Sequence, residues 1–241
     1  MPPGSISRVP SAGEVAIGEN MQIIENLWQV GGDGYTSSDD AAVYLVRFGQ
    51  HAALIDAGCG SGHDLLIGNI SACLPGNIPI TTLFLTHCHF DHTGGAEALR
   101  HHYGCRIVAH KEDAVYLESG DSKVTAASWY GTRMEPLKID LLLHDPSQTL
   151  TVGEGSIKAY HWPGHSPGSV IYTTELDGQR VLFGQDVHGP IHPDLLSDRT
   201  LYQQSLKLML SLNADILCEG HFGVIKGKNN VRRFIGSYLE I

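Results

Sequence analysis

Hydrophobic positions in the first half of the chain form short runs that are typical of strands, and amphipathic stretches separate the later runs. Five runs predict strands, at Gln22–Gln29, Ala42–Arg47, Ala52–Asp56, Ile80–Leu85 and Arg106–Ala109. Apolar positions with helical spacing predict helices at His63–Leu74 and Ala96–Tyr103. The first half therefore predicts one sheet-forming unit with helices beside it.

The second half repeats this plan. Five further runs predict strands, at Thr149–Val152, Ile157–Trp162, Ser169–Thr174, Arg180–Phe183 and Asp215–Cys218. Helices are expected at Thr200–Leu212 and Val231–Leu239, and the first is expected to bury an apolar face of Leu201, Leu208, Met209 and Leu212. Two sheet-forming halves flanked by helices predict a layered α/β sandwich with the helices outside.

Two segments do not follow this pattern. Residues 112–145 fit no strand pattern and are expected to cover the mouth of a site. Residues 1–20 form a polar leader that lacks the charged start and apolar stretch of a secretory signal. We hypothesise that this leader packs on its own domain or on a neighbouring subunit of a homo-oligomer. Residues 21–241 are predicted to form a single domain.

The composition excludes several classes of function. The net charge is −10, with 26 acidic against 16 basic residues, which argues against nucleic-acid binding and fits a small-molecule substrate. No apolar run approaches the roughly 18 residues of a membrane span, so a soluble protein without a membrane partner is predicted. The five scattered cysteines suggest a reducing compartment, with the cytoplasm as the default location. Cys105 and Cys218 are expected in the core, and Cys88 is expected to point away from any bound metal.

Four potential metal ligands lie within six residues, 87–92, just after the predicted strand Ile80–Leu85. They are His87, His89, Asp91 and His92. A His-x-His pair at a strand end projects both rings to one side, and the residues one turn on can reach a second ion. Imidazole nitrogen and carboxylate oxygen suit zinc or iron. The segment therefore predicts a catalytic metal site.

Three more ligand types stand where a predicted strand ends and glycine or proline bends the chain. They are His165, Asp186 and His221. Loops at the ends of sheet strands are where α/β proteins gather their sites. We therefore expect these three side chains to join the first four.

These seven residues occur in the motif order of the metallo-β-lactamase superfamily, and the chain resembles its glyoxalase-II-like dinuclear hydrolases from about Gln22 to Leu239. The resemblance implies an αββα four-layer sandwich with the metals between the two sheets. It also implies a ligand assignment: His87, His89 and His165 for one metal, Asp91, His92 and His221 for the other, and Asp186 as the bridge. Asp56 matches the family's aspartate that orients a ligand histidine.

The resemblance implies a hydrolase with two Zn²⁺ per chain, although the same ligands accept iron or manganese. A hydroxide that bridges the metals would attack a thioester or, second in preference, a lactone or related ester. Asp91 is the candidate to accept and pass on a proton. The bridging position of Asp186 argues against β-lactam hydrolysis as the main activity, and only 20 residues follow His221, too few for a glutathione-binding helical segment.

Other functions stay open. An iron-dependent persulfide dioxygenase, or a related oxidoreductase on the same fold, would use one iron and oxygen instead of water. A ligand-binding or effector protein on a retired hydrolase scaffold is the third possibility. Five residues in or near the loops around the site are the predicted substrate contacts: His110, His188, His192, Trp129 and Tyr130.

Overall fold

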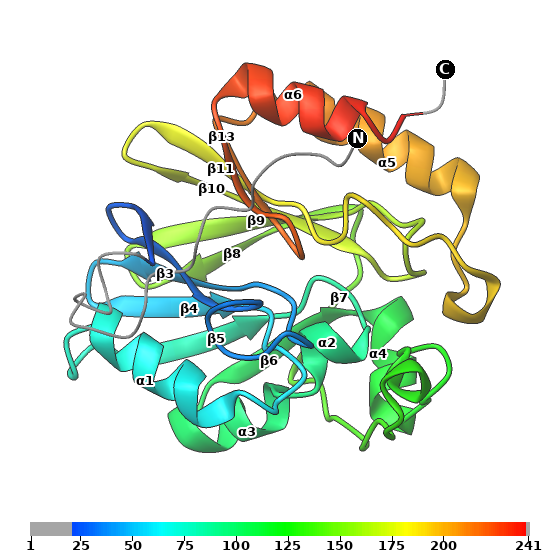
Figure 1. Ribbon diagram of the computed structural model, residues 1–241. Helices are drawn as coiled ribbons and strands as arrows, with labels where there is room; N and C mark the ends of the chain where they lie inside the picture. Colours follow the sequence, from blue (N-terminus) through cyan, green and yellow to red (C-terminus); the bar gives the residue numbers. More distant parts are fainter. Residues whose placement is uncertain (1–20, 240–241) are drawn as a thin grey trace, which may run out of the picture.

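The computed structural model describes residues 21–239. Within this range two mixed β-sheets, each with parallel and antiparallel strand pairs, face one another (Figure 1). The first sheet contains, in spatial order, β1 (Gln22–Ile24), β2 (Leu27–Gly31), β3 (Val43–Phe48), β4 (His51–Ile55), β5 (Ile80–Phe84), β6 (Arg106–His110) and β7 (Leu141–Leu143). The second contains β13 (Gly223–Lys226), β12 (Ile216–Glu219), β11 (Gln179–Phe183), β10 (Val170–Leu176), β9 (Gly155–His161) and β8 (Ser147–Val152).

Helices cover the outer face of each sheet, as Figure 1 shows. The first sheet carries α1 (His63–Cys73), α3 (Ala96–Tyr103) and α4 (Lys111–Ser119), and the second carries α5 (Arg199–Ser211) and α6 (Lys228–Gly236). A short helix, α2 (Phe90–Thr93), lies at the end of the sandwich, as do the 3₁₀ turns η1 (Ala127–Tyr130) and η2 (Pro193–Leu195). The αββα sandwich expected from the sequence is confirmed, and it forms a single domain.

The central strands are apolar on both faces because each face has its own core. In β3, Tyr44 and Val46 point into the core between the two sheets, whereas Val43 and Leu45 point into the core beneath α1 and α3. In β11, Leu182 points into a third core, beneath α5 and α6. Strands buried on both faces show continuous apolar runs rather than alternation, which is why the sequence pattern located them so readily.

The structure corrects four details of the expected elements. Gln22–Gln29 is not one strand but parts of β1 and β2, which turn at Asn26, where φ is +65°. Residues 112–145 are not devoid of regular structure, because they contain most of α4 and also η1 and β7. Strand β13 was not expected, since it is only four residues long.

The fourth correction concerns the buried face of α5. Met209 is buried and Leu212 packs against the core as predicted, but Leu201 and Leu208 are exposed, and Tyr202 and Leu206 complete the buried face instead. The spacing predicted the helix correctly but placed two of its four residues on the wrong face.

Strand direction brings the loops that carry the candidate ligands to one end of the sandwich. Strands β4 and β5 are parallel, and so are β11 and β12. Because β9 is antiparallel to β10 and β10 is antiparallel to β11, β9 runs in the same direction as β11. The segments that follow these strands therefore gather at two facing sheet edges, the usual place for a site in an α/β fold.

No helix within residues 21–239 is long and apolar enough to cross a membrane. The leader, residues 1–20, lies outside the described residues, so its packing, the homo-oligomer and the cytoplasmic location stay predictions.

Candidate metal centre

One group of possible ligands is fully buried. His87 and His89 follow β5, His165 lies in the loop between β9 and β10, and Asp186 follows β11. The ligand atoms of these four residues all lie within 4.8 Å of one another. The ring centroids of His87 and His89 are 4.4 Å apart, and those of His89 and His165 are 4.5 Å apart. Three strand ends thus converge on a space the size of one ion.

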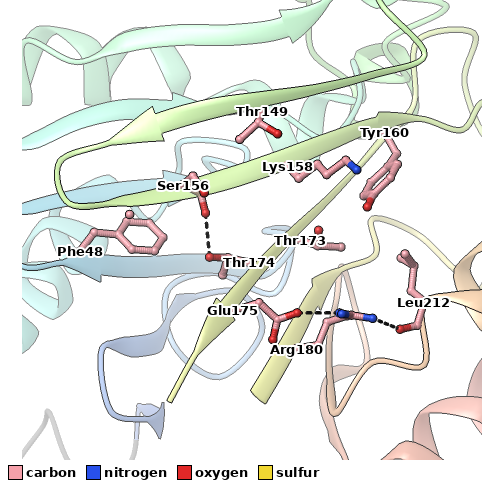
Figure 2. A pocket seen from close by; sticks show the side chains of 11 residues that line it. Phe48, Thr149, Ser156, Lys158, Tyr160, Thr173, Thr174, Glu175, Arg180 and Leu212 are labelled. Carbon is pink, nitrogen blue, oxygen red and sulfur yellow. Dashed lines mark hydrogen bonds and ion pairs between the residues drawn. The ribbon is translucent and has the colours of Figure 1, made fainter. Parts of the chain in front are cut away.

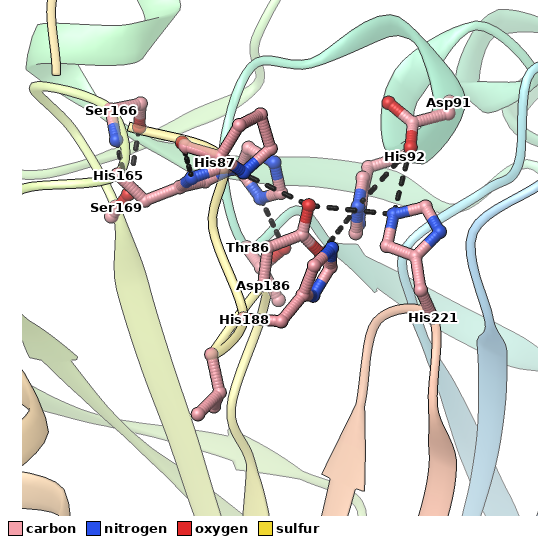
Figure 3. Close-up of polar contacts among 12 residues, drawn as sticks. Thr86, His87, Asp91, His92, His165, Ser166, Ser169, Asp186, His188 and His221 are labelled. Atoms are coloured by element: carbon pink, nitrogen blue, oxygen red, sulfur yellow. Dashed lines mark hydrogen bonds and ion pairs between the residues drawn. The ribbon is translucent and has the colours of Figure 1, made fainter. Parts of the chain in front are cut away.

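A second group lies beside it and reaches the surface. Asp91 and His92 come from α2, His221 follows β12, and Asp186 belongs to this group as well. His221 Nε2 is 3.0 Å from Asp91 Oδ2, and His92 Nε2 is 3.7 Å from the same oxygen. His221 is exposed, whereas the other three residues are buried. Figure 3 shows its ring opposite Asp91 and His92.

Asp186 is the one residue that the two groups share. Its Oδ1 lies 3.1 Å from His92 Nε2, and its Oδ2 lies 3.4 Å from both His165 Nε2 and His221 Nε2. Gly220 makes this approach possible, because a Cβ at that position would overlap Asp186 Oδ1. The Asp186 carboxylate thus lies beside histidines of both groups, and a carboxylate in this position can bridge two cations.

Several polar atoms at the centre are buried without a hydrogen-bond partner. They are the Nε2 atoms of His87, His89, His92 and His165, and Oδ1 of Asp186. Buried polar groups are almost always satisfied, so a cluster of unsatisfied atoms directed at one place calls for an ion. The residues present therefore fit a divalent metal centre.

The pKa values of two buried ligands, His87 and His89, are consistent with metal binding. Burial, followed by the neighbouring His92, lowers the pKa of His87 well below its ordinary value. Burial, followed by His165, lowers the pKa of His89 to about 3. Both rings are consequently neutral near pH 7, and a neutral imidazole is the form that binds a metal.

Asp56 lies where it can orient a ligand, as expected from the sequence. Its carboxylate accepts hydrogen bonds from His92 Nδ1, from the Thr86 amide and from the Thr86 hydroxyl, each at 2.8 Å. Because a carboxylate holds Nδ1 of His92, Nε2 is the ring nitrogen that is directed toward the other ligands of the second group. Asp56 adopts a left-handed φ of +61°, a strained conformation that is typical of functional positions.

Sequence reasoning missed Asp113, which ties the two loops of the buried group together. Its buried carboxylate accepts from the Cys88 amide at 2.8 Å, the Gly168 amide at 2.6 Å and the Ser166 hydroxyl at 2.6 Å. Burial raises the pKa of Asp113 above its ordinary value, against these hydrogen bonds. Cys88 itself is buried beneath the helices, away from the ligands, as predicted.

Sequence reasoning also missed Glu219, the corresponding carboxylate of the second group. It is fully buried and accepts from His188 Nδ1 at 2.9 Å, the His221 amide at 2.7 Å and the Phe222 amide at 2.8 Å. An acidic residue at the end of a buried strand, directly before Gly220 and His221, was the available signal.

The family model of the metallo-beta-lactamase superfamily matches residues 39–221, which include every candidate ligand. The chain belongs to the metallo-beta-lactamase superfamily. A relative from Methanocaldococcus jannaschii, described as a probable metallo-hydrolase, is 26% identical over 80% of this chain and 91% of its own length. The fold agrees with that of a metallo-beta-lactamase from Cronobacter sakazakii, with a TM-score of 0.72 at 20% identity over 90% of this chain and 92% of that one.

Two further superfamily relatives are thioesterases. An atrochrysone carboxyl ACP thioesterase of Aspergillus fumigatus is 29% identical over 76% of this chain, and an acyl-coenzyme A thioesterase of Gallus gallus is 29% identical over 64% of it. The matched segments cover 38% and 59% of those two proteins, so this chain corresponds to only part of each. Membership and relatives together support a metal-binding hydrolase.

A cleft of about 180 Å³ opens onto the metal centre of this superfamily member. Four candidate ligands lie at its floor: His89, Asp91, Asp186 and His221. Three of the five predicted substrate contacts, Trp129, Tyr130 and His188, are among the residues that line it. His192 does not line it but packs against the edge of the Trp129 ring, with centroids 5.2 Å apart.

The fifth predicted contact, His110, is buried and does not line the cleft. It stacks on His161 with ring centroids 3.6 Å apart and planes inclined by 14°, and Glu112 completes a third group of possible ligands. Because imidazole lone pairs lie in the ring plane, those of two stacked rings stay in nearly parallel planes and do not both aim at one ion. His161 Nε2 also lies 3.0 Å from the Pro167 carbonyl. This group therefore lacks the convergence of the first two.

A larger cavity of about 500 Å³ lies on the strands of the second sheet, from β8 to β11 (Figure 2). An exposed ion pair crosses it, with Arg180 Nε 2.7 Å from Glu175 Oε1. None of the three ligand groups found in residues 21–239 lies in this cavity. Its size alone therefore does not make it a catalytic site.

Proposed function

We propose that this chain is a dinuclear metallohydrolase that cleaves the thioester, or the lactone or ester, of a small molecule. The observation that carries the proposal is the shared position of Asp186, with unsatisfied ligand atoms on both of its sides. A dioxygenase with one iron would need only the buried group. The second group, Asp91, His92 and His221, would then have no purpose.

The buried group would hold one ion and the more exposed group the other. The ligands are mainly histidine nitrogens, together with carboxylate oxygens, and this set suits zinc. Iron or manganese could bind instead, depending on which metal is supplied. When bound, two divalent ions supply hydroxide at neutral pH and polarise the carbonyl of the substrate.

Asp91 is the proposed proton acceptor. It is one of two carboxylates at the floor of the cleft, and the Tyr130 hydroxyl is hydrogen-bonded to it. Burial, followed by the Asp91 charge, raises the pKa of Tyr130, so the phenol keeps its proton and donates it to this hydrogen bond. Asp91 can accept a proton from the attacking water and pass it to the departing thiolate or alkoxide.

Thioesters come first among the substrates because two relatives are named as thioesterases, one for acyl-coenzyme A and one for an acyl carrier protein. In both cases a thiolate leaves from an acyl carbonyl. The bond between the acyl group and sulfur is the common chemistry, and the nature of the acyl group differs.

The test is a comparison of rates for the zinc-loaded protein on five substrates: an acyl-coenzyme A, S-lactoylglutathione, an acyl-homoserine lactone, a penicillin and a phosphodiester. We expect the acyl-coenzyme A to be hydrolysed fastest and the phosphodiester slowest. Asp91→Asn, which keeps the size of the side chain but not its charge, should abolish turnover without unfolding the protein. One bound iron together with oxygen uptake on a persulfide would replace this proposal by the dioxygenase.

A further inference from the structure

Exposed aromatic side chains lie at the catalytic cleft and beside it. Trp129 and Tyr130, which line the cleft, are 49% and 40% exposed, and Phe222, which lines the neighbouring cavity with His221, is 59% exposed. Large apolar side chains of a soluble protein gather on its surface mainly where a ligand or partner binds. Ala126 and Leu195 add apolar lining to the cleft beside the candidate ligands.

Contacts on both sides fix this aromatic rim in place. The Trp129 ring packs on His192, and Lys123 forms an ion pair with Asp194 at 3.0 Å, which joins the segment before η1 to the loop around η2. The Tyr130 ring contacts that of Phe90, with centroids 5.7 Å apart. A rim that is already ordered binds an apolar group without first paying the entropy of ordering its side chains.

A second cavity, of about 440 Å³, begins on the other side of His221. It is polar, and Asp33, Ser38 and Asp40 are part of its lining. Asp40 is buried and already accepts hydrogen bonds from the Thr36 hydroxyl and the Cys59 amide, so its charge is fixed in place. His221 belongs to both cavities, so a substrate on the metal centre can extend into each of them.

Charge distinguishes these cavities from a site for anions. Among the described residues that line either cavity there is no lysine or arginine. The aspartates of the cleft, Asp91 and Asp186, are candidate metal ligands, whereas Asp33 and Asp40 of the second cavity belong to neither ligand group. An anionic group in the second cavity would therefore meet two carboxylates with no lysine or arginine to offset them. The glycine carboxylate of glutathione and the ring carboxylate of a penicillin are groups of this kind.

We propose, on the basis of the function proposed above, that the substrate is a thioester or ester with an uncharged, apolar acyl group about the size of one ring. This group lies against Trp129 and Tyr130, and the part of the leaving group next to the scissile bond, which is polar and uncharged, lies in the cavity beyond His221. The cleft volume of about 180 Å³ supports the size, because a cavity of about 150 Å³ holds a benzene molecule.

The test uses N-acetylcysteamine thioesters, in which an uncharged leaving group is constant and only the acyl group varies. We expect kcat/KM to rise about fourfold for each methylene buried, and so about 250-fold over the four methylenes from acetyl to hexanoyl, with phenylacetyl as good as hexanoyl. Adipoyl, which has six carbons but ends in a carboxylate, should fall at least about tenfold below hexanoyl, because its carboxylate would lose water against the apolar lining.

Two variants locate the effect. Trp129→Ala should lower the ratio of phenylacetyl to acetyl kcat/KM by about tenfold, since an aromatic contact is lost. Leu65→Ala, at an exposed leucine on α1 that lines neither cavity, should leave this ratio unchanged. Equal rates for acetyl and hexanoyl, or an adipoyl rate that matches hexanoyl, would overturn the inference while the hydrolase stands. Failure of the two-metal protein to hydrolyse any thioester would instead overturn the thioesterase function and the inference with it.

Discussion

The two ligand groups of the metal centre share Asp186 but differ in how they meet solvent. His87, His89 and His165 are all buried, and their rings contact one another. In the second group, the side chain of His221 is 33% exposed and lines both cavities. The buried group is thus built into the structure, and the second group also faces the substrate. We expect the same kind of substitution to have different consequences in each.

The largest effect is expected at the shared residue. Asp186→Ala removes a ligand from both groups, so zinc content should fall from two ions per chain to one or fewer. The activity should fall by on the order of a thousandfold or more, because a bound metal contributes several kcal/mol to catalysis. Metal analysis and kcat/KM on the best thioester measure both effects. Two retained ions in this variant would rule out Asp186 as the bridge.

The next comparison sets a buried ligand against an exposed one. His165→Ala should reduce activity and also lower the free energy of unfolding of the metal-free protein, since it leaves a cavity in a packed site. His221→Ala should reduce activity with little change in that free energy, because its ring is exposed. Thermal unfolding in a chelator and activity after zinc loading separate the two. Equal stability losses would mean that the groups do not differ in the way their burial indicates.

A smaller effect is expected from the carboxylates that hold the loops. Asp113→Asn and Glu219→Gln each replace one carboxylate oxygen with an amide NH2 group. In either orientation of the new amide, this group faces a backbone N–H that it cannot accept from. Each variant should lower the binding affinity for one of the two ions by about 10–100-fold, as is typical for residues that position metal ligands.

Titration with cobalt, followed by visible absorption, should show which ion is affected. Asp113→Asn should weaken binding at the buried group and Glu219→Gln binding at the second group. The reverse order, or an equal loss at both sites from either variant, would contradict the assignment of one carboxylate to each group.

The smallest effect concerns the third histidine group. Burial, followed by His161, lowers the pKa of His110 to about 4. The unfolded chain takes up a proton at this histidine near pH 6.5, but the folded chain does not, so stability is lost as the pH falls from about 6.5 to 4. His110→Asn keeps a side-chain acceptor at the N-terminus of α4 but removes the titration.

The metal-free variant should therefore lose less stability between pH 6.5 and 4 than the metal-free parent chain, with zinc content unchanged. Urea unfolding at a series of pH values measures the difference. A lower zinc content in His110→Asn would mean that this group binds an ion after all.

Much of the site could be predicted because its ligands follow strand ends in local motifs. His87, His89, Asp91 and His92 are adjacent in sequence, and glycines mark the other three positions. Asp113 could not be found in this way, because its partners Ser166 and Gly168 are 53 and 55 residues away in the chain. Such a carboxylate is recognised only when the loops that it joins are seen together.

The fold shows the same division. Apolar runs located the central strands because those strands are buried on both faces. The pattern did not orient α5, where leucines lie on more than one side, and Tyr202 and Leu206 are buried instead of Leu201 and Leu208. Periodicity predicts that a helix is present, but packing against Ile171 and Leu217 decides which side is covered.

The most direct measurement is anomalous X-ray diffraction at the zinc absorption edge from crystals of the zinc-loaded protein. Two anomalous peaks about 3.5–4 Å apart are expected, one among His87, His89 and His165, the other among Asp91, His92 and His221, with Asp186 between them. A single peak at full zinc loading, or two peaks that do not share Asp186, would contradict the dinuclear centre.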